Sequence, residues 1–134
     1  EGLGDEFMTD LLAASEREYV QMLMVSLLIH SPIVTDFMRL TLAEARRTYK
    51  PSLISDAWSE FYNTRVRAYA ELGGFSDSTV KKMGNNAIKA LVDSGYLSDS
   101  RTKKIQPVYL IPEVKEWLVR LSREDLIDVM ECTI

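Results

Sequence analysis

Apolar residues recur every three or four positions along most of this chain, and prolines, glycines or polar clusters interrupt the repeats. This spacing is typical of helices that bury one face and expose the other. Pro32, Pro51 and the Gly73-Gly74 pair mark helix ends, because proline lacks the helical N–H and glycine favours helix termini. The predicted helices cover residues 5–14, 16–30, 33–48, 54–71 and 78–94, with two more that begin at Pro112 and after Ser122.

The segment 16–30 is apolar nearly all round. A helix of this kind is normally surrounded by other helices, so we predict that it lies at the centre of the fold. Leu23 and Leu27 are then expected in the core, where an aspartate would become an unpaired buried charge and unfold the domain.

A helix, a basic turn and an apolar run follow one another in the second half of the chain. The helix 78–94 stops at Gly95, and the basic turn separates it from the apolar run 105–111. Segments 96–98 and 105–111 are predicted to pair as a small β-hairpin, in which Pro107 restricts its strand to an edge.

This order of elements resembles the recognition helix and wing of a winged helix. The predicted fold class is therefore mainly α: a helical bundle with a winged-helix-like helix and a small β-hairpin. Residues 1–72 are expected to form the helical core. Residues 73–134 would form the winged-helix-like segment with the C-terminal helices, and the two parts are expected to pack as one domain.

The charge is distributed unevenly along the chain. The protein as a whole carries a net charge of −4, yet residues 65–104 hold 8 basic and 4 acidic side chains. The segments before and after this region are both acidic. A basic region in an acidic protein is a candidate surface for a polyanion, and it is also commonly a solvated helix face. The pattern alone favours neither interpretation.

Lysine and asparagine side chains occupy the polar face of helix 78–94, and the turn after it is basic. Lysine and arginine contact phosphates, whereas asparagine can also reach base edges when its helix enters a groove. The candidate nucleic-acid-binding residues are Lys81, Lys82, Asn85, Asn86, Lys89, Arg101, Lys103 and Lys104.

Residues suited to catalysis are sparse. His30 is the only histidine and Cys132 the only cysteine, and no glycine-rich loop precedes a helix as a phosphate cradle would require. The histidine and cysteine spacing does not match a zinc site. We therefore expect no enzyme activity, no cofactor, no metal and no small-molecule substrate.

The most apolar run, residues 19–29, is shorter than the roughly 20 residues that a membrane-spanning helix needs. We expect no membrane partner, and the single cysteine favours a reducing cytoplasm. The sequence begins at Glu1 rather than at a methionine, so we expect further residues upstream.

The order of several motifs resembles the BrxA family, small accessory proteins of the BREX bacteriophage-exclusion systems. The resemblance covers roughly residues 10–115 and rests on segments 28–38, 58–61, 78–83, 91–97 and 107–108. It implies a cytoplasmic, all-helical, non-enzymatic component of a multi-protein defence system that associates with DNA. Family members carry an additional N-terminal helix-turn-helix-like region that would precede Glu1.

Two functions follow as hypotheses. The first is a DNA-binding or DNA-associated accessory component of a bacterial phage-defence (BREX) system, with DNA and other BREX proteins as partners. The alternative is a protein–protein scaffold subunit of the same system without direct DNA contact, in which the basic residues meet acidic partner surfaces. The salt dependence of binding separates the two, because phosphate contacts release counterions.

Overall fold

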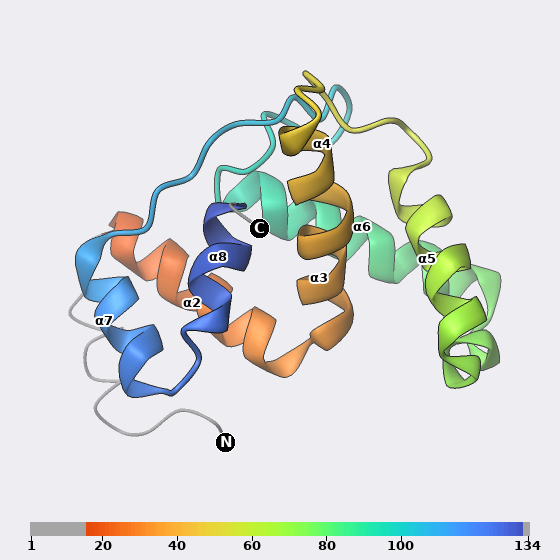
Figure 1. Ribbon diagram of the computed structural model, residues 1–134. Helices are drawn as coiled ribbons and strands as arrows, with labels where there is room; N and C mark the ends of the chain where they lie inside the picture. The colour runs from red at the N-terminus through yellow and green to blue at the C-terminus, as the bar shows by residue number, and fades with distance from the viewer. Residues whose placement is uncertain (1–15, 133–134) are drawn as a thin grey trace.

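Helices form most of the structure, a computed structural model that describes residues 16–132 (Figure 1). The predicted helix 5–14 therefore lies outside the described residues. The elements in chain order are α2 (Glu16–His30), α3 (Pro32–Phe37), the π-helix η1 (Met38–Leu42), α4 (Ala43–Arg47), α5 (Ala57–Ala68), the 3₁₀-helix η2 (Ala70–Gly74), α6 (Asp77–Asp93), α7 (Pro112–Arg120) and α8 (Asp125–Glu131). The mainly α-helical class predicted from the sequence is confirmed.

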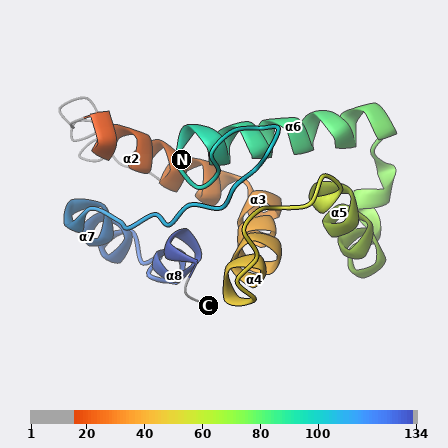
Figure 2. The same ribbon diagram turned by 90° about the horizontal axis from the view of Figure 1, so that it is seen from above.

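Residues 32–47 form one continuous helical rod, in which the π turn η1 joins α3 to α4. This rod contacts α5 on one side and α8 on the other. Seen from above, α2 and α6 lie along one side of the molecule, and α7, α8, the rod and α5 form a row along the other (Figure 2). The rod lies within that row, between α8 and α5, whereas α2, which was predicted to be central, lies on the opposite side of the molecule.

The prediction that α2 is buried all round is wrong. Gln21, Met24 and Leu28 are buried on its inner side, whereas Tyr19 and Leu23 are 41% and 44% exposed. An apolar side chain shows that burial is favourable, but it does not show which face another element covers. Here the outer side of α2 has no covering helix among the described residues.

The core joins both halves of the chain. Phe37 makes edge-on contacts with the rings of Trp58 and Phe61, with ring centroids 5.2 Å apart in each pair. Buried residues from α6, α7 and α8, including Leu91 and Leu118, belong to the same cluster. The rod and α5 therefore share their apolar surface with elements from the second half.

The predicted β-hairpin is wrong, because residues 16–132 contain no strand. Leu97 and Ile105 form one isolated antiparallel bridge between the two segments. The Gln106 N–H donates to the Tyr96 carbonyl at 2.9 Å, and the next residue is Pro107. The Tyr96 N–H donates to the Leu91 carbonyl at the end of α6, at 2.9 Å, and is not available to Gln106, so the pairing stops there. The winged-helix arrangement, which needs this hairpin as its wing, is not supported.

The end of the apolar run 105–111 is bound by a buried side chain, and no strand of the described residues pairs with it. The Gln21 amide nitrogen donates to the Tyr109 carbonyl at 3.1 Å, and its oxygen accepts from the Ile111 N–H at 2.9 Å. Gln21 is only 5% exposed, so both of its polar groups need partners inside the protein. Residues 109–111 are thus fixed against α2 by a glutamine.

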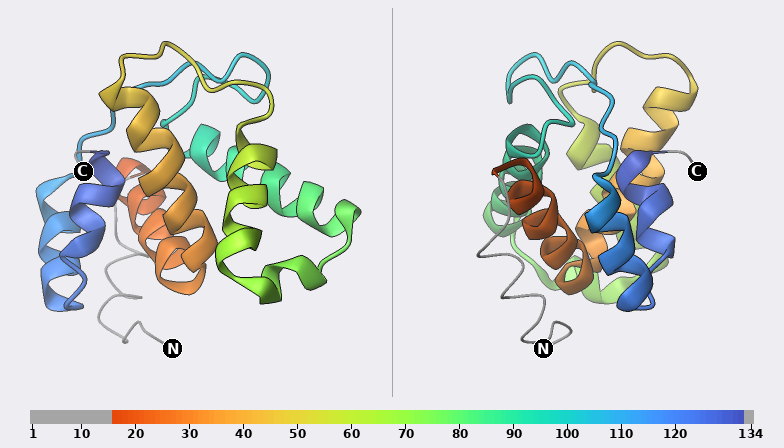
Figure 3. Two further views of the ribbon diagram at one scale, coloured as in Figure 1. Left: turned by 45° about the vertical axis from the view of Figure 1, so that its right-hand side comes forward. Right: turned by 90° about the vertical axis from the view of Figure 1, so that its left-hand side faces the viewer.

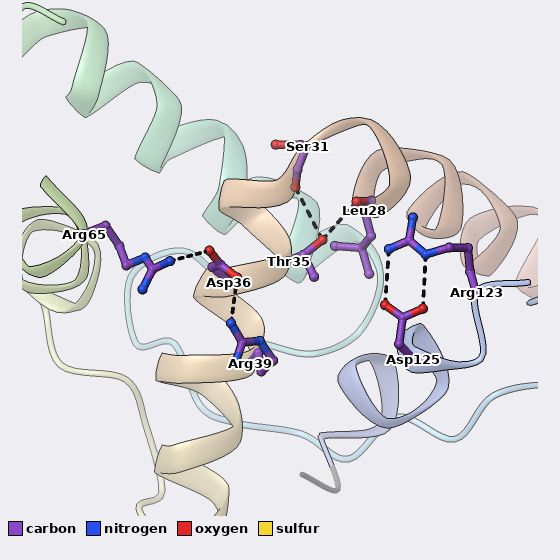
Figure 4. A network of polar contacts seen from close by, with 8 residues as sticks. All are labelled: Leu28, Ser31, Thr35, Asp36, Arg39, Arg65, Arg123 and Asp125. Atoms are coloured by element: carbon purple, nitrogen blue, oxygen red, sulfur yellow. Dashed lines mark hydrogen bonds and ion pairs between the residues drawn. The ribbon is translucent and has the colours of Figure 1, made fainter. Parts of the chain in front are cut away.

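Polar contacts connect the rod to its neighbours (Figure 4). Asp36 on α3 accepts from Arg39 and from Arg65 on α5, each at 2.9 Å. Thr35 donates to the carbonyl of Leu28 in α2 at 2.9 Å. These contacts fix the orientation of α5 and α2 against the rod.

An ion pair lies at the start of α8. The residue preceding α8 is Glu124, and no side chain caps the helix. Instead, Arg123 and Asp125 form a two-point contact at 3.1 and 3.2 Å (Figure 4). The guanidinium hydrogen bonds lower the pKa of the Asp125 carboxyl.

Within the described residues, no single helix combines the length and apolar character needed to cross a membrane. In the part of the chain that the structure describes, α2 and the rod together reach that length and apolar character, but they are bent by 105° relative to each other.

Candidate nucleic-acid interface

A groove with a volume of about 530 Å³ lies between α5, α6 and the basic turn that follows α6. Buried Trp58, Tyr62 and Ile88 form its apolar floor. Its rim is polar and includes two residues of the predicted site on α6 and one on the turn. We call this feature the α5–α6 groove; its rim residues from the predicted site are Lys81, Asn85 and Lys103.

Gly84 allows α5 and α6 to approach closely enough to form the floor. A Cβ atom at this position would lie 2.3 Å from the Trp58 ring. The indole N–H of Trp58 donates to the Val80 carbonyl of α6 at 3.0 Å. Because this ring is rigid and hydrogen-bonded, only glycine fits opposite it.

The sequence pattern of α6 is confirmed. Ser76 caps the helix by accepting from the Thr79 N–H at 3.2 Å. The apolar stripe of the helix faces inward, with Ala87 and Leu91 buried and Val80 and Met83 packed against the core. The predicted polar residues on the opposite side are exposed: Lys82, Asn85, Asn86 and Lys89.

One carboxylate organises the basic turn. Asp99 accepts from the N–H groups of Arg101 and Thr102 at 2.9 and 2.7 Å, and from the Thr102 hydroxyl at 2.8 Å. Hydrogen bonds to the charged form favour ionisation, so the pKa of Asp99 is lowered to about 2. The turn is therefore an ordered element built around Asp99.

The turn is docked on the loop before α5, and it does not project as a wing would. The Lys103 carbonyl accepts from the Leu53 N–H at 3.0 Å, and the Ile105 N–H donates to the Pro51 carbonyl at 2.9 Å. Lys103 itself has a left-handed backbone with φ of 49°. This docking places the half-buried Lys103 on the rim of the groove.

The structure brings three of the eight predicted site residues together, and they are the rim residues named above. Asn86 lines a different hollow, of about 240 Å³, next to Met83 and Ala87. Lys89 pairs with Asp93 at 2.8 Å. Three further predicted residues are exposed but do not line the groove: Lys82, Arg101 and Lys104.

Sequence reasoning missed the contribution of α5 to this rim. Ser59 and Asn63 line the groove and stand four residues apart, so they share one face of the helix. That spacing is visible in the sequence, but the aromatic residues beside it favour a purely structural interpretation. Asp77, at the start of α6, also lines the groove and adds one negative charge.

The two residues with the best capacity for metal binding or nucleophilic chemistry lie outside the groove. The His30 ring hydrogen-bonds the Ser26 carbonyl of its own helix at 2.8 Å. Cys132 is buried, and burial raises the pKa of its thiol to about 11. Within residues 16–132, no three His, Cys, Asp or Glu side chains are grouped to hold a metal ion.

Comparisons with known proteins point to one family. The BrxA family model matches residues 1–122. A relative from Escherichia coli, named BREX protein BrxA, is 43% identical over 123 residues, which cover 92% of this chain and 58% of that protein. A second protein of that name, from Paramagnetospirillum magneticum, is 23% identical over the whole chain and 67% of its own length.

A solved structure shares the fold. It is the crystal structure of an uncharacterized protein from Magnetospirillum magneticum, with a TM-score of 0.88 and 21% identity. The match covers 98% of this chain and 69% of that one. This chain therefore spans little more than half the length of the Escherichia coli relative, and it belongs to the BrxA family.

Proposed function

We propose that this chain is a cytoplasmic, non-enzymatic component of a BREX phage-defence system that contacts DNA through the α5–α6 groove and the basic turn. The names of the two relatives support its place among BREX proteins. The observation that carries the DNA contact is the convergence of Lys81, Asn85 and Lys103 from two separate segments on one rim.

The two lysines on this rim are available to phosphates. Neither Lys81 nor Lys103 pairs with a carboxylate of the described part of the chain. Each phosphate that a lysine neutralises releases a condensed counterion, which favours binding at low salt. Asn85 stands one helical turn from Lys81 and adds a neutral donor beside them.

The shape of the groove favours contact with the nucleic-acid backbone. Its floor is apolar and already covered, since Trp58 and Tyr62 are only 8% and 3% exposed. The polar rim is the accessible part, and its lysines would fix the position of a sugar-phosphate chain without reading sequence. We therefore expect binding that depends weakly on sequence and strongly on salt.

The test is the salt dependence of DNA affinity in single-lysine variants. Lys81→Ala and Lys103→Ala should each weaken binding to every DNA sequence and lower the slope of log affinity against log salt by about one. Fluorescence anisotropy with a labelled duplex between low and moderate salt measures both quantities. Lys115→Ala on α7 removes the same charge outside the groove and should leave the slope unchanged.

An unchanged slope in a Lys81→Ala, Lys103→Ala double variant with normal thermal melting would reject the groove as the DNA surface. The alternative function, a scaffold subunit that meets other BREX proteins, would then be favoured.

A further inference from the structure

The end of α4 with the loop after it, and the basic turn after α6, lie together at one end of the molecule (Figure 3). Ser52 and Lys104 form an isolated antiparallel bridge between the two segments. We call this feature the two-loop tip; it comprises residues 44–56 and 98–106. We propose that the tip binds an unpaired DNA base by stacking it on Tyr49, an inference that rests on the proposed function and adds the class of DNA preferred.

Tyr49 presents its ring to solvent just beyond the end of α4. It is 93% exposed, more than any other large hydrophobic residue of the described chain. Its N–H donates to the Arg46 carbonyl at 3.0 Å, and the Lys50 N–H donates to the Ala45 carbonyl at 2.9 Å. This pair of bonds is the Schellman motif, in which the residue at the position of Tyr49 has a left-handed backbone and is usually glycine.

A tyrosine at this position is unfavourable for the isolated chain. Its φ of 60° strains the backbone, and glycine would relieve that strain. The exposed ring contributes almost nothing to the core in return. Ser122 and Cys132 also have positive φ just after a helix, but neither places a large ring in solvent. A strained residue that is almost fully exposed points to a ligand that covers its ring.

The bridge places cations beside this ring. Leu53 is buried and Ile105 packs against the core, so these two residues face inward from the paired segments. Side chains alternate along extended chains, and Ser52 and Lys104 therefore face outward. Lys50 is exposed as well and directly follows the tyrosine.

The charge of the tip selects an anionic ligand. Its residues include six basic and three acidic side chains, in a protein whose net charge is −4. The excess persists when the paired Glu44 and Arg47 are both left out, with five basic and two acidic side chains remaining. Three of the basic residues are exposed and form no ion pair with the described residues: Lys50, Arg101 and Lys104.

An aromatic ring among unpaired cations is typical of surfaces that bind single-stranded nucleic acid. The cations neutralise phosphates, and the ring stacks on a base of any sequence. In a closed duplex the neighbouring bases cover each base face, so the ring can stack only on a base that has left the duplex. The tip also continues the DNA surface, because Lys103 of the same turn lines the α5–α6 groove.

The first experiment compares two labelled DNAs of equal length, a closed duplex and the same duplex with a central run of mismatched, unpaired bases. Each is titrated with the full 134-residue chain by fluorescence anisotropy. The wild type should bind the opened duplex about fivefold or more tightly than the closed one. Tyr49→Ala should remove this preference and leave the affinity for the closed duplex unchanged. Tyr49→Trp, which retains a ring, should keep the preference.

A matched control is Tyr109→Ala, which removes a ring that is 67% exposed outside the tip and should change neither affinity. Tyr49→Gly should lose the preference as Tyr49→Ala does while melting at a higher temperature than wild type, because glycine relieves the strain. Loss of the preference in Tyr49→Gly with a lower melting temperature would overturn the role of the strained backbone.

Equal wild-type affinities for the two DNAs would overturn the proposal and leave the ring to a protein partner. Equal losses on both DNAs in Tyr49→Ala would also overturn it, because the ring would then not act through an unpaired base. The salt slope of the closed duplex in the Lys81→Ala, Lys103→Ala double variant decides the proposed function separately, since that DNA offers no unpaired base. Absence of binding to both DNAs would overturn the two proposals together.

The second experiment locates the base. A 5-iodouracil placed in the unpaired run of the opened duplex crosslinks on irradiation to an aromatic ring that stacks on it. Mass spectrometry should find the crosslink on the peptide that contains Tyr49, and Lys104→Ala should lower the affinity for the opened duplex and its salt slope by about one. A crosslink confined to other peptides would overturn the proposal.

Discussion

The carboxylate of Asp99 shows how one residue positions a whole site. It gathers two backbone N–H groups and a hydroxyl into the turn whose carbonyl at Lys103 then binds the loop before α5. The position of Lys103 on the groove rim therefore depends on an acidic residue that the charge pattern alone would count against the site.

The ionisation of Asp99 should be visible in the acid titration of the turn. Its folded pKa of about 2 lies below the ordinary 3.8, so its stabilising contribution is present above about pH 4 and is lost as the pH falls towards 2. NMR titration of the Asp99 carboxyl should give a midpoint near 2, with the Arg101 and Thr102 amides shifting together with it. Asp99→Asn should abolish this transition, and a wild-type midpoint near 3.8 would contradict it.

Packing between elements has its tightest point where α6 passes Trp58. Gly84→Ala would gain up to about 1 kcal/mol of helix propensity. It would also force a methyl group against a ring whose atoms lie 2.3–2.7 Å from the new Cβ, and such overpacking costs about 1–3 kcal/mol or more. We expect a net loss of stability in chemical denaturation. Gly74→Ala, whose Cβ meets nothing within 4 Å, is the control and should be neutral or slightly stabilising.

The two sides of α2 should respond differently to charge. Leu28 is 1% exposed, so Leu28→Asp buries a carboxylate and should cost about 4 kcal/mol or more, enough to unfold a marginal domain. Leu23→Asp should change the free energy of unfolding by only about 0.5 kcal/mol. Circular dichroism melts of both variants measure the contrast. Equal destabilisation would mean that the outer side of α2 is covered in solution.

At the scale of the whole molecule, α5 separates two grooves. One side of this helix borders a rim that carries lysines, and the other borders a groove whose lining holds two glutamates, one lysine and one arginine. The salt slope of DNA binding in the Lys81 and Lys103 variants tests the first of these grooves.

Local features were predictable from the sequence because they depend on neighbours along the chain. Helix periodicity, the Ser76 cap and the split of α6 into an apolar stripe and a lysine–asparagine face all arise within a few turns. The ordered motifs likewise indicated the family that the comparisons identify. These features established the helical class and the side of α6 that meets solvent.

Only the tertiary structure decided which of these surfaces meet. Elements far along the chain decide which side of α2 is covered and which is exposed. The contact of Gln21 with residues 109–111 and the placement of Lys81 and Lys103 on one groove also join residues far apart in sequence. An apolar or basic side chain has the same local pattern whether or not another element covers it. Burial and convergence result from contacts across the whole fold, and the repeat of residues along one helix does not encode them.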